Sequence, residues 1–121
     1  GLDLRVFEGF RSRVRQNKLY NNGKNVTKVK GGGSYHNYGL AVDIVFYNKN
    51  GEPSWSENHD WGQLGAIGKQ VGLKWGGDFK SISDRSHLEY HPGINMREIQ
   101  NVYRLKGLKG VWDLVSEKGE E

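Results

Sequence analysis

An aspartate lies in the middle of the most apolar stretch of this 121-residue chain. Residues 40–46 read Leu-Ala-Val-Asp-Ile-Val-Phe, so Asp43 has three apolar residues on each side. A short run that is apolar on both faces predicts a central strand that is covered on both sides. Burying an ionised carboxylate without a partner is costly, so Asp43 needs a cation, a cluster of hydrogen bonds or a metal ion. A salt bridge to an arginine and a share in a metal site both meet this need.

The rest of the pattern predicts short strands and helices in irregular alternation, which is typical of an α+β fold. Apolar spacing and turn residues predict two further strands, at residues 4–7 and 73–75. They also predict three helices, at residues 12–21, 57–71 and 95–105. Gly23 is expected to close the first helix, and Asn95 with Glu98 to cap the start of the last one. We expect loops at residues 31–33, 47–56 and 78–86, and beyond the last helix a tail at residues 106–121 that is frayed at its end.

Composition limits the classes of protein and of metal site. The length suits one domain, 35% of the residues are hydrophobic and 26% are charged, so an ordinary soluble globular domain is expected without membrane insertion. No signal peptide is visible, and residues 1–3 resemble the entry into a domain, so we expect the sequence to be part of a longer protein. The chain has no cysteine, which excludes disulfides and leaves imidazole and carboxylate as metal ligands. The net charge of +4 suits solubility or a polyanionic partner, but no nucleic-acid motif accompanies it, so no nucleic-acid partner is expected.

Two histidines could join Asp43 around one ion. His36 lies seven residues before Asp43, across a bend at Gly39, and this separation lets a loop residue fold back beside the strand. A third ligand must be another His, Asp or Glu, and His87 is the best candidate. His91 is a rival, although His-Pro-Gly favours a turn. Three protein ligands with water in the remaining position make a catalytic zinc site.

Other residues near these candidates suggest roles in chemistry. Asp84 lies three residues before His87 and could act as a general base beside a metal-bound water. Arg11 could stabilise an oxyanion or a substrate carboxylate, or could form a surface ion pair. Ser34 could orient His36 or a substrate carbonyl. His59 is explained by capping at a helix start.

Residues 34–43 fit the pattern S-x-H-x-x-G-x-A-x-D. This pattern resembles the signature of the D-Ala-D-Ala peptidase, or VanY-like, family of zinc peptidases, which is related in fold to the hedgehog N-domain. Within that family the chain is most similar to the L-alanyl-D-glutamate endopeptidases of phage endolysins and bacterial wall hydrolases. Three further segments support the likeness: residues 8–20, 75–79 and 84–87. The resemblance covers residues 4–105, so it implies one zinc peptidase domain over residues 1–121, with an antiparallel sheet and flanking helices.

The resemblance implies a zinc site in which a metal-activated water cleaves the L-Ala–D-Glu bond of peptidoglycan stem peptides. It assigns the zinc ligands to His36, Asp43 and His87, the general base to Asp84, an intermediate or substrate clamp to Arg11, and a substrate hydrogen-bond donor to Ser34. A monomer acting on the bacterial wall, in the periplasm or outside the cell, is expected.

Two alternatives share the fold. One is a D,D- or L,D-carboxypeptidase that trims terminal D-Ala, and the other is a zinc-containing binding module without catalysis. The carboxypeptidase branch tends to have Glu at the position of Asp84, and a non-catalytic module should lack this base. Leu88 also departs from the family, whose members usually have an aromatic residue there, and this difference is expected to alter packing beside the metal but not ligation.

Overall fold

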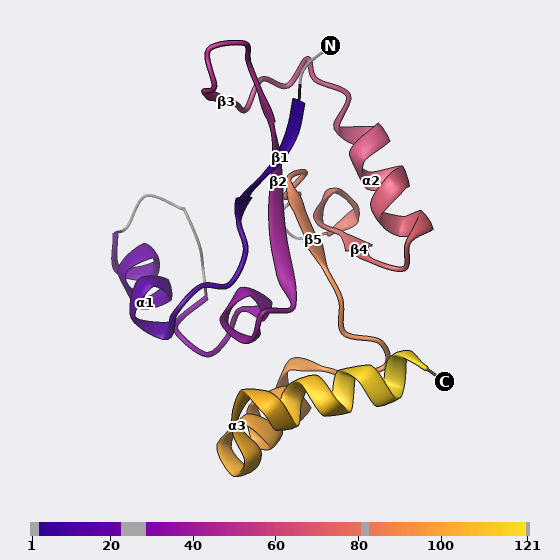
Figure 1. Cartoon of the computed structure of the whole chain (residues 1–121). Coiled ribbons are helices and arrows are strands. Elements are labelled where there is room, and N and C mark those ends of the chain that lie inside the picture. The colour runs from indigo at the N-terminus through magenta and orange to yellow at the C-terminus, as the bar shows by residue number, and fades with distance from the viewer. Residues whose placement is uncertain (1–2, 23–28, 81–82, 121) are drawn as a thin grey trace. The chain divides into compact units, whose positions relative to one another are not determined.

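The structure is a computed structural model that describes residues 3–22, 29–80 and 83–120 (Figure 1). The chain divides into two compact units. The first contains residues 1–9 and 41–90, and the second contains residues 10–40 and 91–121. In the described part of the chain, no helix combines the length and the apolar character needed to cross a membrane.

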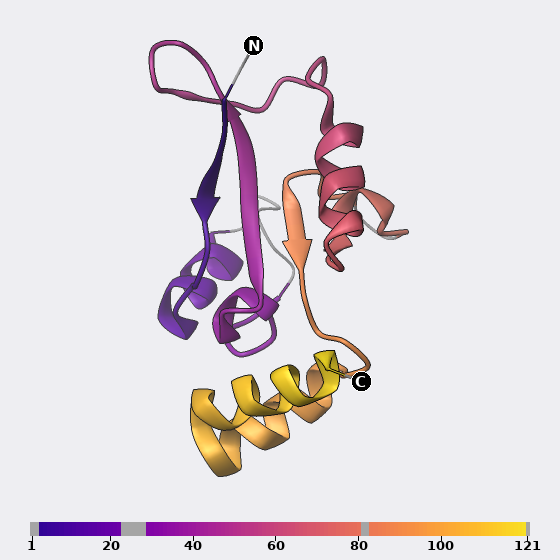
Figure 2. The same ribbon diagram turned by 45° about the vertical axis from the view of Figure 1, so that its right-hand side comes forward.

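The first unit is built on an antiparallel sheet, as predicted. Its strands are β1 (Asp3–Glu8), β2 (Ala41–Tyr47), β3 (Pro53–Ser54), β4 (Lys74–Trp75) and β5 (His87–Glu89). They lie in the order β1-β2-β5-β4, with β3 paired to the far end of β2 (Figures 1 and 2). The apolar strand β2 therefore lies between two neighbours, which confirms its predicted central position. Strand β5, which contains only three residues, has no counterpart in the sequence-based expectation.

Helix α2 (Trp61–Gln70) covers one face of this sheet. Two glycines allow the helix to lie close to the sheet. A Cβ atom at Gly65 would collide with the Trp75 ring, and one at Gly68 would collide with the side chain of Leu88. Val42, Leu88 and Trp75 are cross-strand partners on this covered face. Side chains alternate between the faces of a strand, so the residues next to them in sequence face the other way.

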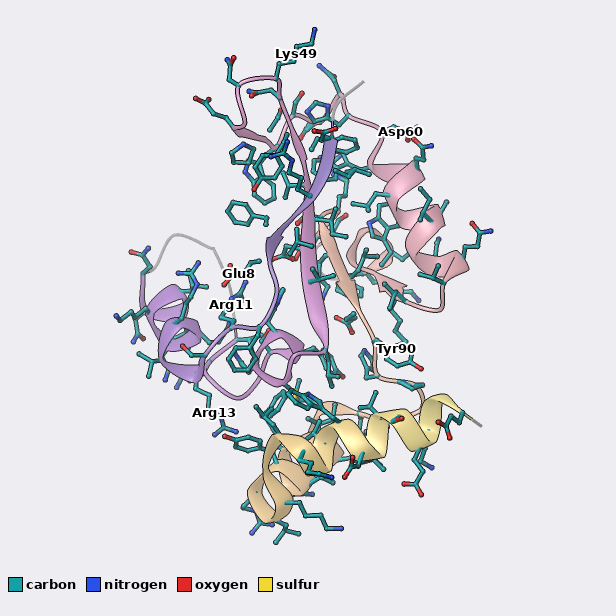
Figure 3. All side chains as sticks on the ribbon, in the orientation of Figure 1. Glu8, Arg11, Arg13, Lys49, Asp60 and Tyr90 are labelled. Atoms are coloured by element: carbon teal, nitrogen blue, oxygen red, sulfur yellow. The ribbon has the colours of Figure 1, made fainter. Side chains whose placement is uncertain are left out.

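The start of α2 differs from the expectation. The helix begins at Trp61 rather than near residue 57, because the side chain of Asp60 accepts a hydrogen bond from the backbone N of Gln63 at 3.1 Å and caps the N-terminus (Figure 3). The prediction that His59 caps this helix is therefore wrong. His59 instead pairs with Ser54, with 2.7 Å between Nε2 and Oγ, and its ring stacks on Phe46.

The second unit is helical. It contains α1 (Arg13–Asn21), the 3₁₀ turn η1 (Tyr35–Tyr38) and α3 (Met96–Gly119). Ser12 caps α1 through a bond from the backbone N of Arg15, and Asn95 with Glu98 forms the predicted capping box of α3. The expectation that Gly23 closes the first helix concerns a residue outside the described ones.

The last helix is longer than the predicted residues 95–105. Helix α3 continues to Gly119, with a break at Gly107 (φ 71°, ψ −168°) where the chain reverses direction (Figure 2). A positive φ of this size is easily adopted only by glycine. Beyond the break Val111 and Val115 are buried, so the C-terminal half is held by its apolar residues.

Candidate metal centre

Asp43 and His87 lie directly opposite each other on β2 and β5. Both side chains occupy the face of the sheet opposite to α2, because their neighbours Val42 and Leu88 point toward that helix. The Asp43 Oδ1 atom lies 3.4 Å from Nδ1 of His87, and the two side chains are only 14% and 10% exposed. The buried carboxylate in the apolar strand thus has a histidine partner within its own unit.

Asp84 reaches the same histidine from the turn that precedes β5. Its backbone N donates to the carbonyl of Gly76 at 2.9 Å, and the backbone N of His87 donates to the Asp84 carbonyl at 3.1 Å. This approach requires glycine at position 76, because a Cβ atom there would collide with the Asp84 carbonyl. The Asp84 carboxylate lies 3.9 Å from Nδ1 of His87, and its side chain is 53% exposed. A carboxylate in this place is close to the histidine and accessible to water.

Glu89 completes the surroundings of His87, and sequence reasoning missed it. The Nε2 atom of His87 donates to Oε1 of Glu89 at 2.7 Å, with both groups buried. In the sequence, Glu89 follows His87 by two residues, and this spacing places both side chains on one face if the segment is a strand. Recognising it required knowing that residues 87–89 form a strand.

The hydrogen bonds of His87 determine which nitrogen can bind a metal. Since Nε2–H donates to Glu89, Nδ1 carries the lone pair of the neutral ring and faces Asp43. In the metal-free protein, burial lowers the pKa of His87, but hydrogen bonds to Asp43 and Glu89 and the charges of Glu89 and Asp84 outweigh it and raise the pKa to about 9. Binding of a metal ion must therefore displace a proton from this ring.

The spacing of Asp43 and His87 fits a zinc ion. A tetrahedral zinc with nitrogen and oxygen ligands at about 2.0–2.1 Å places its ligand atoms about 3.3–3.4 Å apart. The observed distance of 3.4 Å between Oδ1 of Asp43 and Nδ1 of His87 matches this separation of two ligand atoms. Neutral imidazole and carboxylate are also ligand types that zinc accepts.

The second unit carries the remaining predicted site residues. His36 is buried in η1, where Ser34 caps the turn by accepting a hydrogen bond from the backbone N of His36 at 3.2 Å. The backbone N of Arg11 donates to the His36 carbonyl at 2.9 Å, and Asn37 Nδ2 donates to the Arg11 carbonyl at the same distance. Gly39 ends the turn with φ 71°, at the predicted bend. Ser34 and Arg11 are thus both tied to the backbone of His36.

The guanidinium of Arg11 is fixed by a buried amide. Its Nη1 donates to Oε1 of Gln16 at 2.9 Å, and Nε2 of Gln16 donates to the Val29 carbonyl at 2.7 Å. Gln16 is fully buried, so these bonds hold the arginine in a defined position at the start of α1.

Both halves of α3 support the loop that contains His36. Gln100 Nε2 donates to the carbonyl of Gly32 at 3.0 Å, and Trp112 Nε1 donates to that of Tyr38 at 2.7 Å. The segment predicted to be a tail beyond the last helix therefore helps to position a candidate ligand.

The structure also explains two other residues, His91, the rival candidate for the third ligand, and Leu88, which departs from the family pattern. The Nδ1 atom of His91 bonds to the Ile94 carbonyl at 3.1 Å and its ring stacks on Tyr35, consistent with the predicted turn. Leu88 packs toward Gly68 on the face covered by α2, so the expectation that it alters packing beside the metal is wrong.

Within the first unit, Asp43 and His87 each offer one ligand atom to a metal ion, and His36 of the second unit offers an imidazole of the same kind. Two imidazoles and a carboxylate, with Asp84 beside one of the imidazoles, are the donor set of a mononuclear metal site. The model of a peptidase M15 family described as D-alanyl-D-alanine carboxypeptidase matches residues 27–90, and the chain belongs to this family. Peptidases of the M15 group are metallopeptidases.

Several relatives share an activity in their names. The peptidoglycan L-alanyl-D-glutamate endopeptidase CwlK of Bacillus subtilis (strain 168) is 40% identical over 76% of this chain and 63% of its own length. The L-alanyl-D-glutamate peptidase of Listeria phage A118 is 27% identical over 75% of this chain and 31% of its own. The crystal structure of the Serratia marcescens L-Ala D-Glu endopeptidase ChiX matches with a TM-score of 0.56 and 27% identity, over 82% of this chain and 71% of that one. The chain spans less than two thirds of the length of either sequence relative.

Proposed function

We propose that this chain is a zinc-dependent peptidoglycan hydrolase that cleaves the L-Ala–D-Glu bond of stem peptides. The observation that carries the proposal is the geometry around His87, whose Nδ1 lies 3.4 Å from the Asp43 carboxylate and 3.9 Å from that of Asp84. One carboxylate is buried, as suits a ligand, and the other is half exposed, as suits a base. The names of the relatives support the bond assignment.

His36 is the third ligand in this proposal, and the two units together form one catalytic domain over residues 1–121, with its core at about 4–105. The donor set His36, Asp43 and His87 supports zinc rather than a hard cation, because two of the three ligands are imidazoles. The enzyme acts as a monomer on the bacterial wall, in the periplasm or outside the cell, with the stem peptide as its partner rather than nucleic acid.

Each residue has one task in the reaction. When bound, zinc would lower the pKa of a water molecule toward ~7 and polarise the scissile carbonyl. Asp84 takes the proton of the attacking water and passes it to the leaving amine. Arg11, whose guanidinium is bound by Gln16, would stabilise the negative charge that develops on the carbonyl oxygen. Ser34 donates a hydrogen bond from its hydroxyl to the substrate, while its oxygen caps η1.

A D,D- or L,D-carboxypeptidase of the same fold is the second candidate, supported by the description of the family model. Its substrate would be the same stem peptide, but its product would be terminal D-Ala. A non-catalytic zinc-containing module is the third candidate, and the presence of Asp84 beside His87 argues against it.

Digestion of purified muropeptides, followed by mass spectrometry of the fragments, separates these candidates. We expect scission between L-Ala and D-Glu, and loss of this activity with a chelator and its return with zinc. Release of terminal D-Ala alone would assign the chain to the carboxypeptidases. Absence of any cleavage by the zinc-loaded protein would contradict a catalytic role.

A further inference from the structure

A small cleft opens beside the proposed base. It has a volume of about 190 Å³ and lies within the first unit. Its lining consists of two tryptophans and one short segment before β5: Trp55, Trp61, Ser83, Asp84, Arg85 and Ser86. Of the described side chains that line the cleft, only Asp84 and Arg85 are charged, so Arg85 is the one cation among them.

Arg85 is positioned by contacts on both its backbone and its side chain. Its carbonyl accepts a hydrogen bond from Nε1 of Trp75 at 2.8 Å, and its guanidinium carbon lies 5.9 Å from the ring centroid of Trp61. Its ion pair with Glu57 is long, at 4.0 Å, and the Glu57 side chain is 89% exposed. A pair of this kind contributes little, so a ligand carboxylate can replace it. The planar guanidinium suits such a group, because it can donate two parallel hydrogen bonds to a carboxylate.

The aromatic lining provides a surface for the body of a ligand. Trp61 is buried, but Trp55 is half exposed and packs edge-to-face against Phe7, with ring centroids 5.1 Å apart. A tryptophan held in place by another ring, yet open on one side, is a suitable platform for the apolar part of a peptide.

The substrate of the proposed reaction brings a carboxylate to this place. Glutamate has two carboxyl groups, and a residue within a peptide uses only one of them in its bond to the next residue. The other remains ionised at neutral pH. Asp84 passes its proton to the nitrogen of this same glutamate, so the remaining carboxylate lies only a few bonds from an atom that Asp84 must approach. Arg85 follows Asp84 directly in the chain and lines the same cleft.

We propose that this cleft binds the remaining carboxylate of the substrate's glutamate, and that Arg85 is the residue that selects it. The inference rests on the proposed cleavage of the L-Ala–D-Glu bond. It adds a preference that the reaction itself does not require, because peptides whose glutamate carboxylate has become a carboxamide contain the same scissile bond. Arg85 contacts substrate in this account but takes no part in bond breaking.

Two synthetic stem peptides test the inference, identical except that one has the glutamate carboxylate and the other a carboxamide. Cleavage rates of both are measured with the zinc-loaded wild type, Arg85→Met, Arg85→Gln and Arg5→Met. Methionine preserves the apolar contact with Trp61 and removes the charge, and glutamine is a second neutral variant in case the first folds poorly. Arg5 is the matched control, because it is a half-exposed arginine in the same unit, bound to Asp3 at 3.0 Å and absent from the cleft.

We expect the wild type to prefer the carboxylate peptide by about tenfold in kcat/KM, mainly through KM, as suits one charge-assisted contact. Arg85→Met and Arg85→Gln should lose this preference, while Arg5→Met should retain it. A preference that persists in both Arg85 variants, or a wild type that cleaves both peptides equally, would overturn the inference and leave the proposed function standing. Failure of the wild type to cleave either peptide would overturn the proposed function, and this inference with it.

Discussion

The Nε2 atom of His87 lies 2.7 Å from Oε1 of Glu89, and both side chains are buried on one face of β5. This contact fixes the orientation of the His87 ring, so that its Nδ1 atom faces Asp43. A carboxylate behind a ligand histidine also increases the basicity of the ring and thereby its affinity for a metal. Glu89 is thus a positioning residue for the proposed zinc site.

The variant Glu89→Gln tests this role. We expect its zinc affinity to fall by about 10–100-fold, because the amide preserves the shape but removes the charge behind His87. Competition with a chromophoric chelator measures the affinity. Glu57→Gln is a suitable control, since Glu57 is exposed and lies in the same unit. Equal zinc affinity in Glu89→Gln and the wild type would show that the contact does not support the metal.

The same surroundings predict an unusual titration of His87 in the metal-free protein. Its pKa of about 9 lies above the ordinary value of 6.5, since the carboxylates around it outweigh the effect of burial. Because the folded-state pKa is raised, the stability that this group contributes is fully present below pH 6.5 and is lost as the pH rises through about 9. NMR titration of the imidazole in metal-free protein measures the pKa directly. A midpoint at or below 6.5 would contradict this prediction, and Glu89→Gln should lower the midpoint.

Asp84 should be needed for the reaction but not for the metal. Asp84→Asn removes the base while preserving the size of the side chain, so we expect kcat to fall by about 10²–10⁴-fold with zinc content unchanged. Asp78→Asn serves as a control, because Asp78 forms an exposed ion pair with Lys69 in the same unit. An Asp84→Asn enzyme with the activity of the wild type would remove Asp84 from the mechanism.

The C-terminal half of α3 should stabilise the second unit. Trp112→Phe removes the hydrogen bond of 2.7 Å to the Tyr38 carbonyl, and we expect the free energy of unfolding to fall by about 1 kcal/mol. Leu105→Ala is a control in the same helix, where Leu105 is 72% exposed and a change of less than about 0.5 kcal/mol is expected. Urea denaturation measures both. Equal stabilities of Trp112→Phe and the wild type would indicate that this bond does not hold the loop of His36.

The sequence predicted those features that depend on local pattern. The central strand around Asp43, the bend at Gly39 and the capping box of Asn95 were found because each is encoded within about ten residues. Chemistry predicted that Asp43 has a partner, since a carboxylate in an apolar strand needs one, and His87 was the best candidate for a further ligand of the same ion, but their pairing across two strands was not predicted.

What the sequence did not predict depends on contacts between distant segments. Strand β5 is too short to show a period of its own, so Glu89 could not be placed on the face of His87. The end of α3 reads as a charged tail until Val111 and Val115 are seen to be buried. His59 was misassigned because its partners, Ser54 and Phe46, lie on other elements.

The zinc content of the purified protein tests the central claim most directly. Elemental analysis should find one zinc ion per chain in the wild type and in Asp84→Asn, and a loss of bound zinc in His36→Ala, Asp43→Ala and His87→Ala alike. Zinc at full occupancy in any of these three variants, or a wild type that binds none when supplied with it, would contradict the account.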